Sequence, residues 1–91
     1  MQVKRTLEQI KELEYIRQSE LAELNGVRPS TVKYYSELGI LPYSQKETGL
    51  GKYYHKEEAS NRLQEILKLK VQGKSITEIV SHFITSNANN S

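Results

Sequence analysis

Residues 19–41 read SELAELNGVRPSTVKYYSELGIL, and this stretch carries the strongest structural pattern in the chain. Ser19–Leu24 has the composition of a short helix, and Asn25-Gly26 ends it because glycine suits the left-handed position after a helix C-terminus. Pro29 opens a second helix, where its missing N–H would be unpaired anyway, and this helix runs to about Leu38. Two short helices joined by a turn that contains glycine predict a helix-turn-helix.

The second of these helices has two different faces. Val32, Tyr35 and Leu38 share an apolar face, whereas the remaining side chains are short polar groups or long donors: Ser30, Thr31, Lys33 and Tyr34. The major groove of DNA is wide enough for one α-helix, and a helix N-terminus offers free N–H groups to a phosphate. We therefore expect residues 29–38 to lie in the major groove, with Tyr34 on the DNA and Tyr35 in the core.

A β-hairpin is predicted after the second helix. Residues 40–43 are extended in character, Gly49 and Gly51 indicate a turn, and Lys52–Tyr54 forms a plausible returning strand. Lys46 and Lys52 flank the turn, so two cations on a protruding tip could straddle the phosphates beside the groove. We call residues 43–54 the wing.

The segment from Ser19 to Leu41 resembles the MerR family of winged-helix DNA-binding proteins. That family has a SELA-type first helix, a GV-x-P turn, a T-[IV]-[RK]-Y-Y recognition helix and then G-[LI]-[LI]. Lys52-Tyr53-Tyr54 is similar to the family's R-x-Y at the end of the wing, and residues 73–79, GKSITEI, are similar to its GFSLEEI segment. The resemblance spans about residues 15–84. It implies a mainly α fold, a winged helix-turn-helix of MerR type with a two-stranded β-hairpin wing.

The resemblance also implies roles for individual residues. Thr31, Lys33 and Tyr34 would contact phosphates or base edges, and Ser19 would give a phosphate contact from the first helix. On the same basis, Lys52 would be the wing cation. The expected anchors of the wing and core are Tyr35 and Tyr54.

Four departures from the family pattern stand out. Arg28 occupies a position where a capping residue is usual, so side-chain capping is lost, and Ser30 stands where the family often has Arg or Lys. The cation would then have moved two positions along the chain, so that Arg28 reaches the phosphate that the family's usual Arg or Lys at the position of Ser30 reaches. Leu50 places an apolar side chain at the wing tip. The family's long dimerisation helix and effector domain are missing after Ile84, so we expect no small-molecule effector.

Composition narrows the function classes. The chain has 91 residues, enough for one small domain, with no cysteine, no aspartate and a formal net charge of +2. Residues 26–56 hold five basic and two acidic residues and five of the six tyrosines, which favours a nucleic-acid surface. His55 and His82 lack partners at metal-ligand spacing. We therefore expect no enzyme, no cofactor and no metal site, and a cytoplasmic, nucleoid-associated protein.

Amphipathic helices are predicted on both sides of this centre. Residues 3–14 form an N-terminal helix, residues 56–72 form a helix for which His55 is a candidate cap, and Ser75–Glu78 is a capping box that opens a last helix. The predicted buried stripe of the 56–72 helix is Ala59, Leu63, Ile66, Leu67 and Val71. We divide the chain into residues 1–14, a MerR-like domain at 15–84, and a flexible tail at 85–91.

Two functions of different kinds remain open. The first is a small transcriptional regulator, a repressor that occupies a promoter. The alternative is an excisionase-like architectural factor of recombination that binds repeated sites and bends DNA. A third reading is a protein-interaction module. In the first two cases we expect double-stranded DNA as partner and a homodimer or cooperative oligomer, held by the 3–13 helix or the 76–84 helix.

Overall fold

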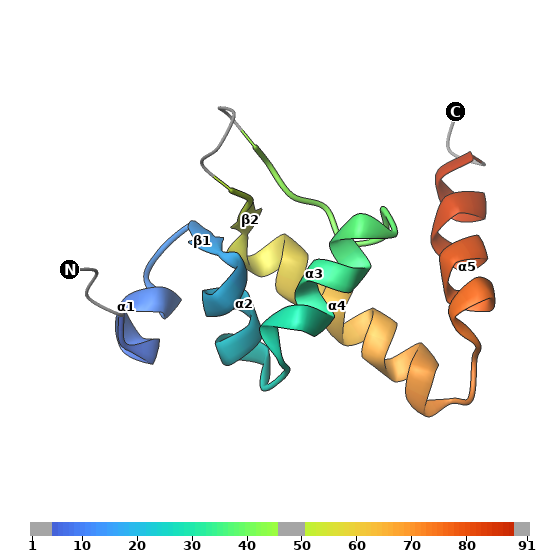
Figure 1. Cartoon of the computed structure of the whole chain (residues 1–91), viewed down its shortest axis with the longest axis horizontal. Helices are drawn as coiled ribbons and strands as arrows, with labels where there is room; N and C mark the ends of the chain where they lie inside the picture. Colours follow the sequence, from blue (N-terminus) through green and yellow to red (C-terminus); the bar gives the residue numbers. More distant parts are fainter. Residues whose placement is uncertain (1–4, 46–50, 89–91) are drawn as a thin grey trace.

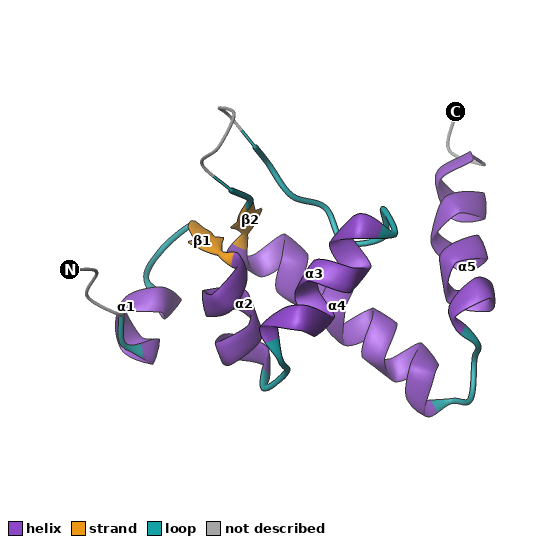
Figure 2. Ribbon diagram, in the orientation of Figure 1, coloured by secondary structure: helices purple, strands orange, loops and turns teal. Residues whose placement is uncertain are grey.

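The computed structural model describes the backbone of residues 5–45 and 51–88 and the side chains as far as Ile84. Five helices and two short strands follow one another along these residues (Figures 1 and 2). In chain order they are α1 (Leu7–Lys11), β1 (Tyr15–Arg17), α2 (Gln18–Asn25), α3 (Pro29–Glu37), β2 (Tyr53–His55), α4 (Lys56–Val71) and α5 (Ile76–Ala88). The predicted mainly helical fold class is confirmed.

The turn between α2 and α3 forms as the sequence predicts. Gly26 caps α2 in the left-handed conformation, with φ of 70°, and the Val27 N–H donates to the Ala22 carbonyl at 3.0 Å. Pro29 is the first residue of α3. In the described residues, the side chain of Arg28 makes no capping hydrogen bond to α3, which confirms the predicted loss of the cap.

The sheet differs from the prediction in its pairing. The returning strand exists as β2, but β2 pairs antiparallel with β1, so that Ile16 faces Tyr54. The predicted partner, residues 40–43, contributes no strand among the described residues; a single bridge between Ser44 and Tyr53 closes the wing base, with N···O distances of 2.7 and 2.8 Å. Ile40 and Leu41 are both buried, so their side chains do not alternate as in a strand, and Pro42 has no N–H to donate.

The core lies between the helix-turn-helix, the sheet and α4. It is built from apolar side chains of every described element: Ile10, Ile16, Leu21, Ala22, Val32, Tyr35, Ile40, Leu41, Tyr54, Ala59, Leu63, Ile66, Ile79 and Phe83. The predicted stripe of α4 is buried at Ala59, Leu63 and Ile66, and Leu67 is half-buried. Val71 is 88% exposed, which corrects that part of the prediction, because it is the last residue of α4 and the chain turns away at Gly73.

The N-terminal helix is shorter than predicted. It spans Leu7–Lys11 and begins at Thr6, whose hydroxyl accepts the Gln9 N–H at 3.2 Å while the Gln9 side chain accepts the Thr6 N–H at 2.9 Å. The chain leaves the helix after Lys11 because it must extend into β1 at Tyr15. The start of the predicted helix, including Val3, lies outside the described residues.

The last helix begins as predicted and ends later. Ser75 and Glu78 form the predicted capping box, with the Glu78 N–H donating to the Ser75 hydroxyl at 3.2 Å. The α5 helix stands beside the end of α4 in Figure 1 and continues to Ala88, into the segment expected to be a flexible tail. No helix within residues 5–45 and 51–88 is long and apolar enough to cross a membrane.

Candidate nucleic-acid interface

The α3 helix separates its side chains into a buried and an exposed set. Val32 and Tyr35 are buried in the core. Arg28, Ser30 and Lys33 are exposed, Tyr34 is 48% exposed, and Thr31 is half-buried. The outer face of α3 is thus a row of hydroxyl groups and cations. It is open along the whole helix, as contact with base edges requires.

The N-termini of α2 and α3 lie side by side. The side-chain amide of Gln18, the first residue of α2, donates to the carbonyl of Pro29, the first residue of α3, at 3.4 Å. Ser19 and Ser30 are each the second residue of their helix, and both are exposed. Each helix N-terminus carries partial positive charge and unpaired N–H groups, so the two together favour anionic phosphates at this edge.

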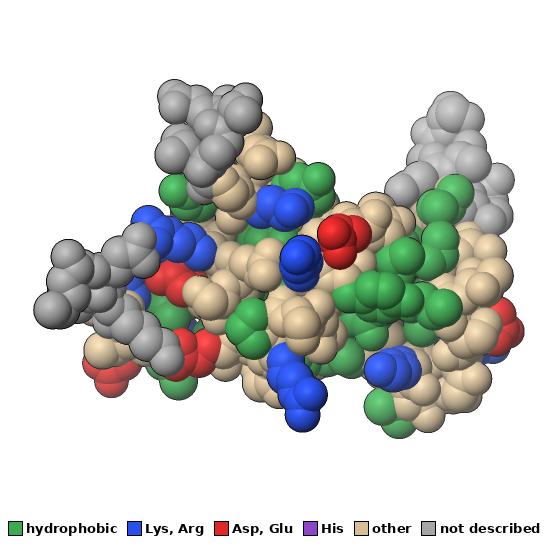
Figure 3. Space-filling model, viewed as in Figure 1, with side chains coloured by type: hydrophobic (Ala, Val, Ile, Leu, Met, Phe, Trp, Pro, Cys, Tyr) green, Lys and Arg blue, Asp and Glu red, His purple; other side chains and the backbone are tan. Residues whose placement is uncertain are grey.

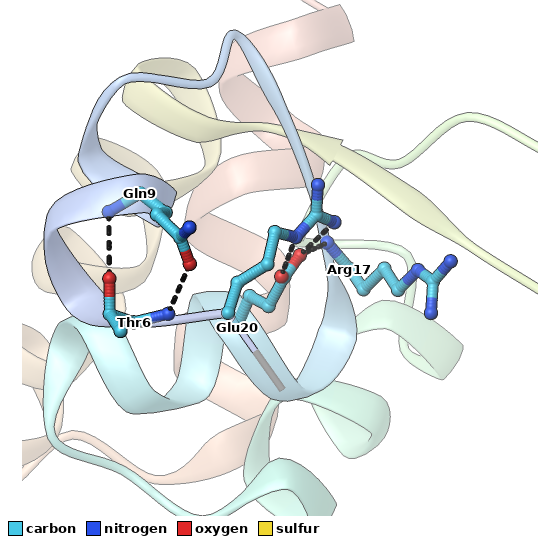
Figure 4. Close-up of polar contacts among 5 residues, drawn as sticks. Thr6, Gln9, Arg17 and Glu20 are labelled. Atoms are coloured by element: carbon cyan, nitrogen blue, oxygen red, sulfur yellow. Dashed lines mark hydrogen bonds and ion pairs between the residues drawn. The ribbon is translucent and has the colours of Figure 1, made fainter. Parts of the chain in front are cut away.

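Glu20 ties the start of α2 to the N-terminal segment (Figure 4). Its carboxylate accepts the backbone N–H of Arg17 at 2.8 Å and binds the guanidinium of Arg5 through both oxygens, with one contact at 2.8 Å. Burial by itself would raise the pKa of Glu20, but the Arg5 and Arg17 hydrogen bonds and the charges of both arginines hold the pKa below its ordinary value. Glu20 is therefore a charged residue in a nearly buried site, 8% exposed.

Arg17 itself is an exposed cation that the sequence reading did not assign. Its side chain extends away from the Glu20 carboxylate in Figure 4. Arg17 faces Tyr53 across the sheet, so it lies one residue from the register position of Lys52. The edge of the sheet thereby adds a cation between the wing and the helix N-termini.

The base of the wing places Lys52 over an aromatic ring. The Lys52 ammonium lies 5.2 Å from the centre of the Tyr43 ring, a cation–π contact, and the Tyr43 ring lies 6.2 Å from that of the buried Tyr54. Tyr35 and Tyr54, the expected anchors of the core and wing, are both buried. Lys46 and the tip residue Leu50 lie outside the described residues.

Charge is distributed unevenly over the surface. Lys and Arg side chains are spread over the face that α3 and its neighbours present in Figure 3, and hydrophobic side chains gather beside them toward α5. A different region, where the end of α1 meets the start of α4, forms a hollow lined by three acidic residues together with Leu13, His55 and Lys56; the acidic residues are Glu12, Glu14 and Glu57. An anionic ligand would therefore be favoured at the first face over the second, where acidic side chains outnumber the single lysine.

The two histidines have ordinary contacts. His55 Nδ1 accepts the Glu58 N–H at 3.3 Å and so caps α4, as predicted, and its ring packs edge-on against Tyr15. His82 packs edge-on against the Phe83 ring. Across the residues that the structure describes, no group of three His or Glu side chains could hold a metal ion.

Two short helices with an exposed second helix, a wing beside it and cations around both define a helix-turn-helix protein that binds nucleic acid. The model of the MerR HTH family of regulatory proteins matches residues 16–83, and the chain belongs to that family. This confirms the resemblance and the winged helix-turn-helix class. The family is one of DNA-binding regulators of transcription and not of enzymes. A search of curated proteins and a search of solved structures each returned no match.

Sequence reasoning missed four residues of this region: Arg17, Gln18, Glu20 and Ser36. Arg17 and Gln18 directly precede the first predicted helix, a position at which cations and amides can reach a ligand of the helix N-terminus. Glu20 stands three residues after Arg17, the spacing of a residue that caps a helix from within, and that spacing is a usable signal. Ser36 gives no local signal, because its partner Tyr54 is distant in sequence.

Proposed function

We propose that this protein binds specific sites in double-stranded DNA and represses transcription by occupying a promoter. The observation that carries the proposal is the outer face of α3, which exposes Arg28, Ser30, Lys33 and Tyr34 along a helix whose opposite face is buried. With α3 in the major groove, the wing would reach the adjacent backbone. The cations around α3 would neutralise phosphates on both sides of the groove.

The proposed contacts fall into two groups. Ser30 and Thr31 would read base edges, because a hydroxyl group at the start of a recognition helix can donate or accept in the groove. Phosphates would be held by Arg28, Lys33, Lys46, Lys52, Tyr34 and Ser19, with Arg17 and Gln18 as additions from the structure. Contacts to phosphates set affinity and salt dependence, whereas contacts to base edges set sequence preference.

We further propose that two or more copies bind together. One module of this size buries about 600–1,000 Å² on DNA, which supports only modest affinity. The α5 helix offers the larger apolar surface, with Ile76 and Ile84 exposed and Val80 half-buried, whereas in the described part of α1 the exposed large apolar residue is Leu7. Contact through α5 is therefore favoured over contact through α1.

The first experiment is a footprint on the DNA around the protein's own gene, across protein concentration and salt. A compact, symmetric protected site over a promoter is the result expected of a dimeric repressor. A growing head-to-tail array of short sites would replace that reading with the excisionase-like one, an architectural protein of recombination. Protection no stronger than on unrelated DNA would contradict specific binding.

A second experiment tests the contacts. Lys33→Ala and Lys52→Ala should each weaken binding to all sequences and each reduce the slope of log K against log salt by about 0.9, since each removes one phosphate contact. Lys70→Ala is the matched control, because Lys70 is an equally charged, exposed residue near the far end of α4. Slopes unchanged by both Lys33→Ala and Lys52→Ala would remove these residues from the interface.

A further inference from the structure

A buried hydrogen bond joins α3 to the wing. The Ser36 hydroxyl lies 2.8 Å from the Val32 carbonyl and 2.6 Å from the Tyr54 hydroxyl. Ser36 has one proton, and the carbonyl can only accept it, so the Tyr54 hydroxyl is the donor to Ser36. Ser36 is 3% exposed and Tyr54 is fully buried, so neither hydroxyl can reach a bound DNA.

The link continues from Tyr54 to the wing cation. The Tyr54 ring contacts the Tyr43 ring at the start of the wing, with centres 6.2 Å apart, and the Lys52 ammonium lies 5.2 Å from the centre of the Tyr43 ring. A continuous row of contacts therefore leads from the inner face of α3 to Lys52. We call Ser36, Tyr54 and Tyr43 the wing anchor.

Backbone hydrogen bonds such as Ile40 N–H to the Tyr35 carbonyl tie the exit of α3 to the first arm of the wing, but the strand pairings among the described residues do not tie β2 to α3. The pairing of β1 with β2 holds the strand to the segment before α2, and the bridge between Ser44 and Tyr53 holds the two arms of the wing to each other. Neither includes a residue of α3. The Tyr54–Ser36 hydrogen bond does, and it is directional, so it defines both the distance and the rotation of β2 relative to the helix.

We propose that Ser36 and Tyr54 are positioning residues for DNA binding: their hydrogen bond, extended through Tyr43, fixes the wing cation Lys52 in register with α3. The two parts then meet the DNA as one preorganised surface, and the cost of ordering the wing on binding is avoided. This inference rests on the proposed DNA binding, and it adds residues that never touch the DNA. In this proposal the contact between Lys52 and Tyr43 holds the Lys52 ammonium in position in the free protein, before DNA binds.

Tyr54→Phe tests the proposal with a single oxygen atom removed. The variant keeps the ring, and the Ser36 hydroxyl keeps its bond to the Val32 carbonyl, so no buried polar group is left unpaired. We expect DNA binding to weaken about 3- to 10-fold at low salt. We also expect the slope of log K against log salt to fall by about 0.9, the contribution of one phosphate, because Lys52 is no longer held at its contact. Adding Lys52→Ala to Tyr54→Phe should then cause little further loss.

The matched control is Tyr15→Phe. It is the same chemical change on the neighbouring strand, at an exposed side chain whose hydroxyl makes no hydrogen bond within the described residues. Its affinity and salt slope should equal those of the unmodified protein.

A double variant separates positioning from stability. Ser36→Ala alone leaves the buried Tyr54 hydroxyl without its partner and is expected to lower the melting temperature. Ser36→Ala combined with Tyr54→Phe removes both polar groups, so much of the lost stability should return. If the pair has a positioning role, the double variant should regain stability but keep the reduced slope of log K against log salt that is expected of Tyr54→Phe. Recovery of stability and slope together would show a purely structural role and overturn the proposal.

The results also distinguish this inference from the proposed function. If Lys33→Ala and Lys52→Ala lower the salt slope but Tyr54→Phe does not, the positioning role fails and DNA binding through α3 and the wing stands. If neither lysine variant changes the slope, Lys52 is not in the interface and the positioning inference fails, whereas the proposed DNA binding is still decided by the footprint. If Lys52→Ala costs as much in the Tyr54→Phe background as in the unmodified protein, the two parts act independently and the inference is wrong.

Discussion

The helix-turn-helix and the C-terminal helix are held in the molecule in different ways. The α2–α3 unit is fixed by apolar burial and by directional bonds: one within the unit, from Gln18 to Pro29, and two from outside it, from Arg5 to Glu20 and from Tyr54 to Ser36. The α5 helix buries Ile79 and Phe83 against α4 and leaves Ile84 53% exposed. The first region is held in a fixed orientation, as the DNA-reading role proposed for it would require. The second keeps apolar area available, as a surface for another copy would.

Arg62 is the point where the two regions meet. Its guanidinium donates to the carbonyl of Ile40, just after α3, at 2.8 Å, and lies 4.3 Å from the centre of the Phe83 ring in α5. One side chain of α4 thus contacts both the exit of the recognition helix and the C-terminal helix.

The largest expected effect comes from shortening a core residue of the first region. Leu21→Ala should lower the free energy of unfolding by about 2–5 kcal/mol, because it opens a cavity at a fully buried position in α2. The comparison variant Ile84→Ala in α5 should cost about 0.5 kcal/mol or less, since that side chain is half exposed. Urea unfolding followed by circular dichroism measures both. Equal losses would show that α5 is as tightly built as the helix-turn-helix.

The next effect concerns the residue that joins the regions. Arg62→Ala should cost about 1–2 kcal/mol, because it removes a charged hydrogen bond to Ile40 and the cation–π contact with Phe83. Amide hydrogen exchange should rise more in α5 than in α2. Arg62→Lys is the control: it keeps the charge but not the planar stacking group, and its loss should be smaller. Equal increases in exchange in both helices would mean that Arg62 supports the whole fold and not the junction.

A smaller, pH-dependent effect is expected at Glu20. Its pKa in the folded protein is lower than the ordinary value of 4.5, so its charged form stabilises the fold fully above that pH. As the pH falls below 4.5 and through the lower folded-state value, this contribution is lost. Glu20→Gln should therefore be less stable than the unmodified protein by about 1 kcal/mol at pH 7, the partial exposure of Arg5 reducing the effect.

The same two proteins at pH 3 provide the check. The stability difference between them should shrink toward zero as Glu20 takes up a proton. A difference that stays constant between pH 7 and pH 3 would mean that shape and hydrogen bonding, and not the charge of Glu20, determine its contribution.

Local patterns in the sequence predicted most of the helical fold. Gly26, Pro29 and the Ser75–Glu78 box act within a few residues of themselves, so their effect is readable without knowing the rest of the chain. The β1 strand was missed because three residues are too few to show an alternating pattern. Its partner β2 lies beyond α3 and most of the wing, and no short-range sequence pattern indicates that these two segments pair.

The candidate site was predictable to a similar extent and for the same reason. The exposed positions of α3 follow from helical periodicity, and Ser30 and Lys33 lie where that periodicity places them. The hydrogen bonds that support this surface do not follow from helical periodicity. Glu20 with Arg5, and Ser36 with Tyr54, each join residues that only the folded chain brings together.

The pairing of Ile16 with Tyr54 has a consequence for how the molecule folds. The helices form from residues that are close in sequence, whereas this contact closes a loop that contains α2, α3 and the wing. Closing such a loop is slow because the chain loses conformational entropy before the stabilising contacts have formed. We expect the sheet to form late, after α2 and α3 have met. The last contacts to form would then be those that seat the wing, so that folding and assembly of the proposed DNA-binding surface would be completed in the same step.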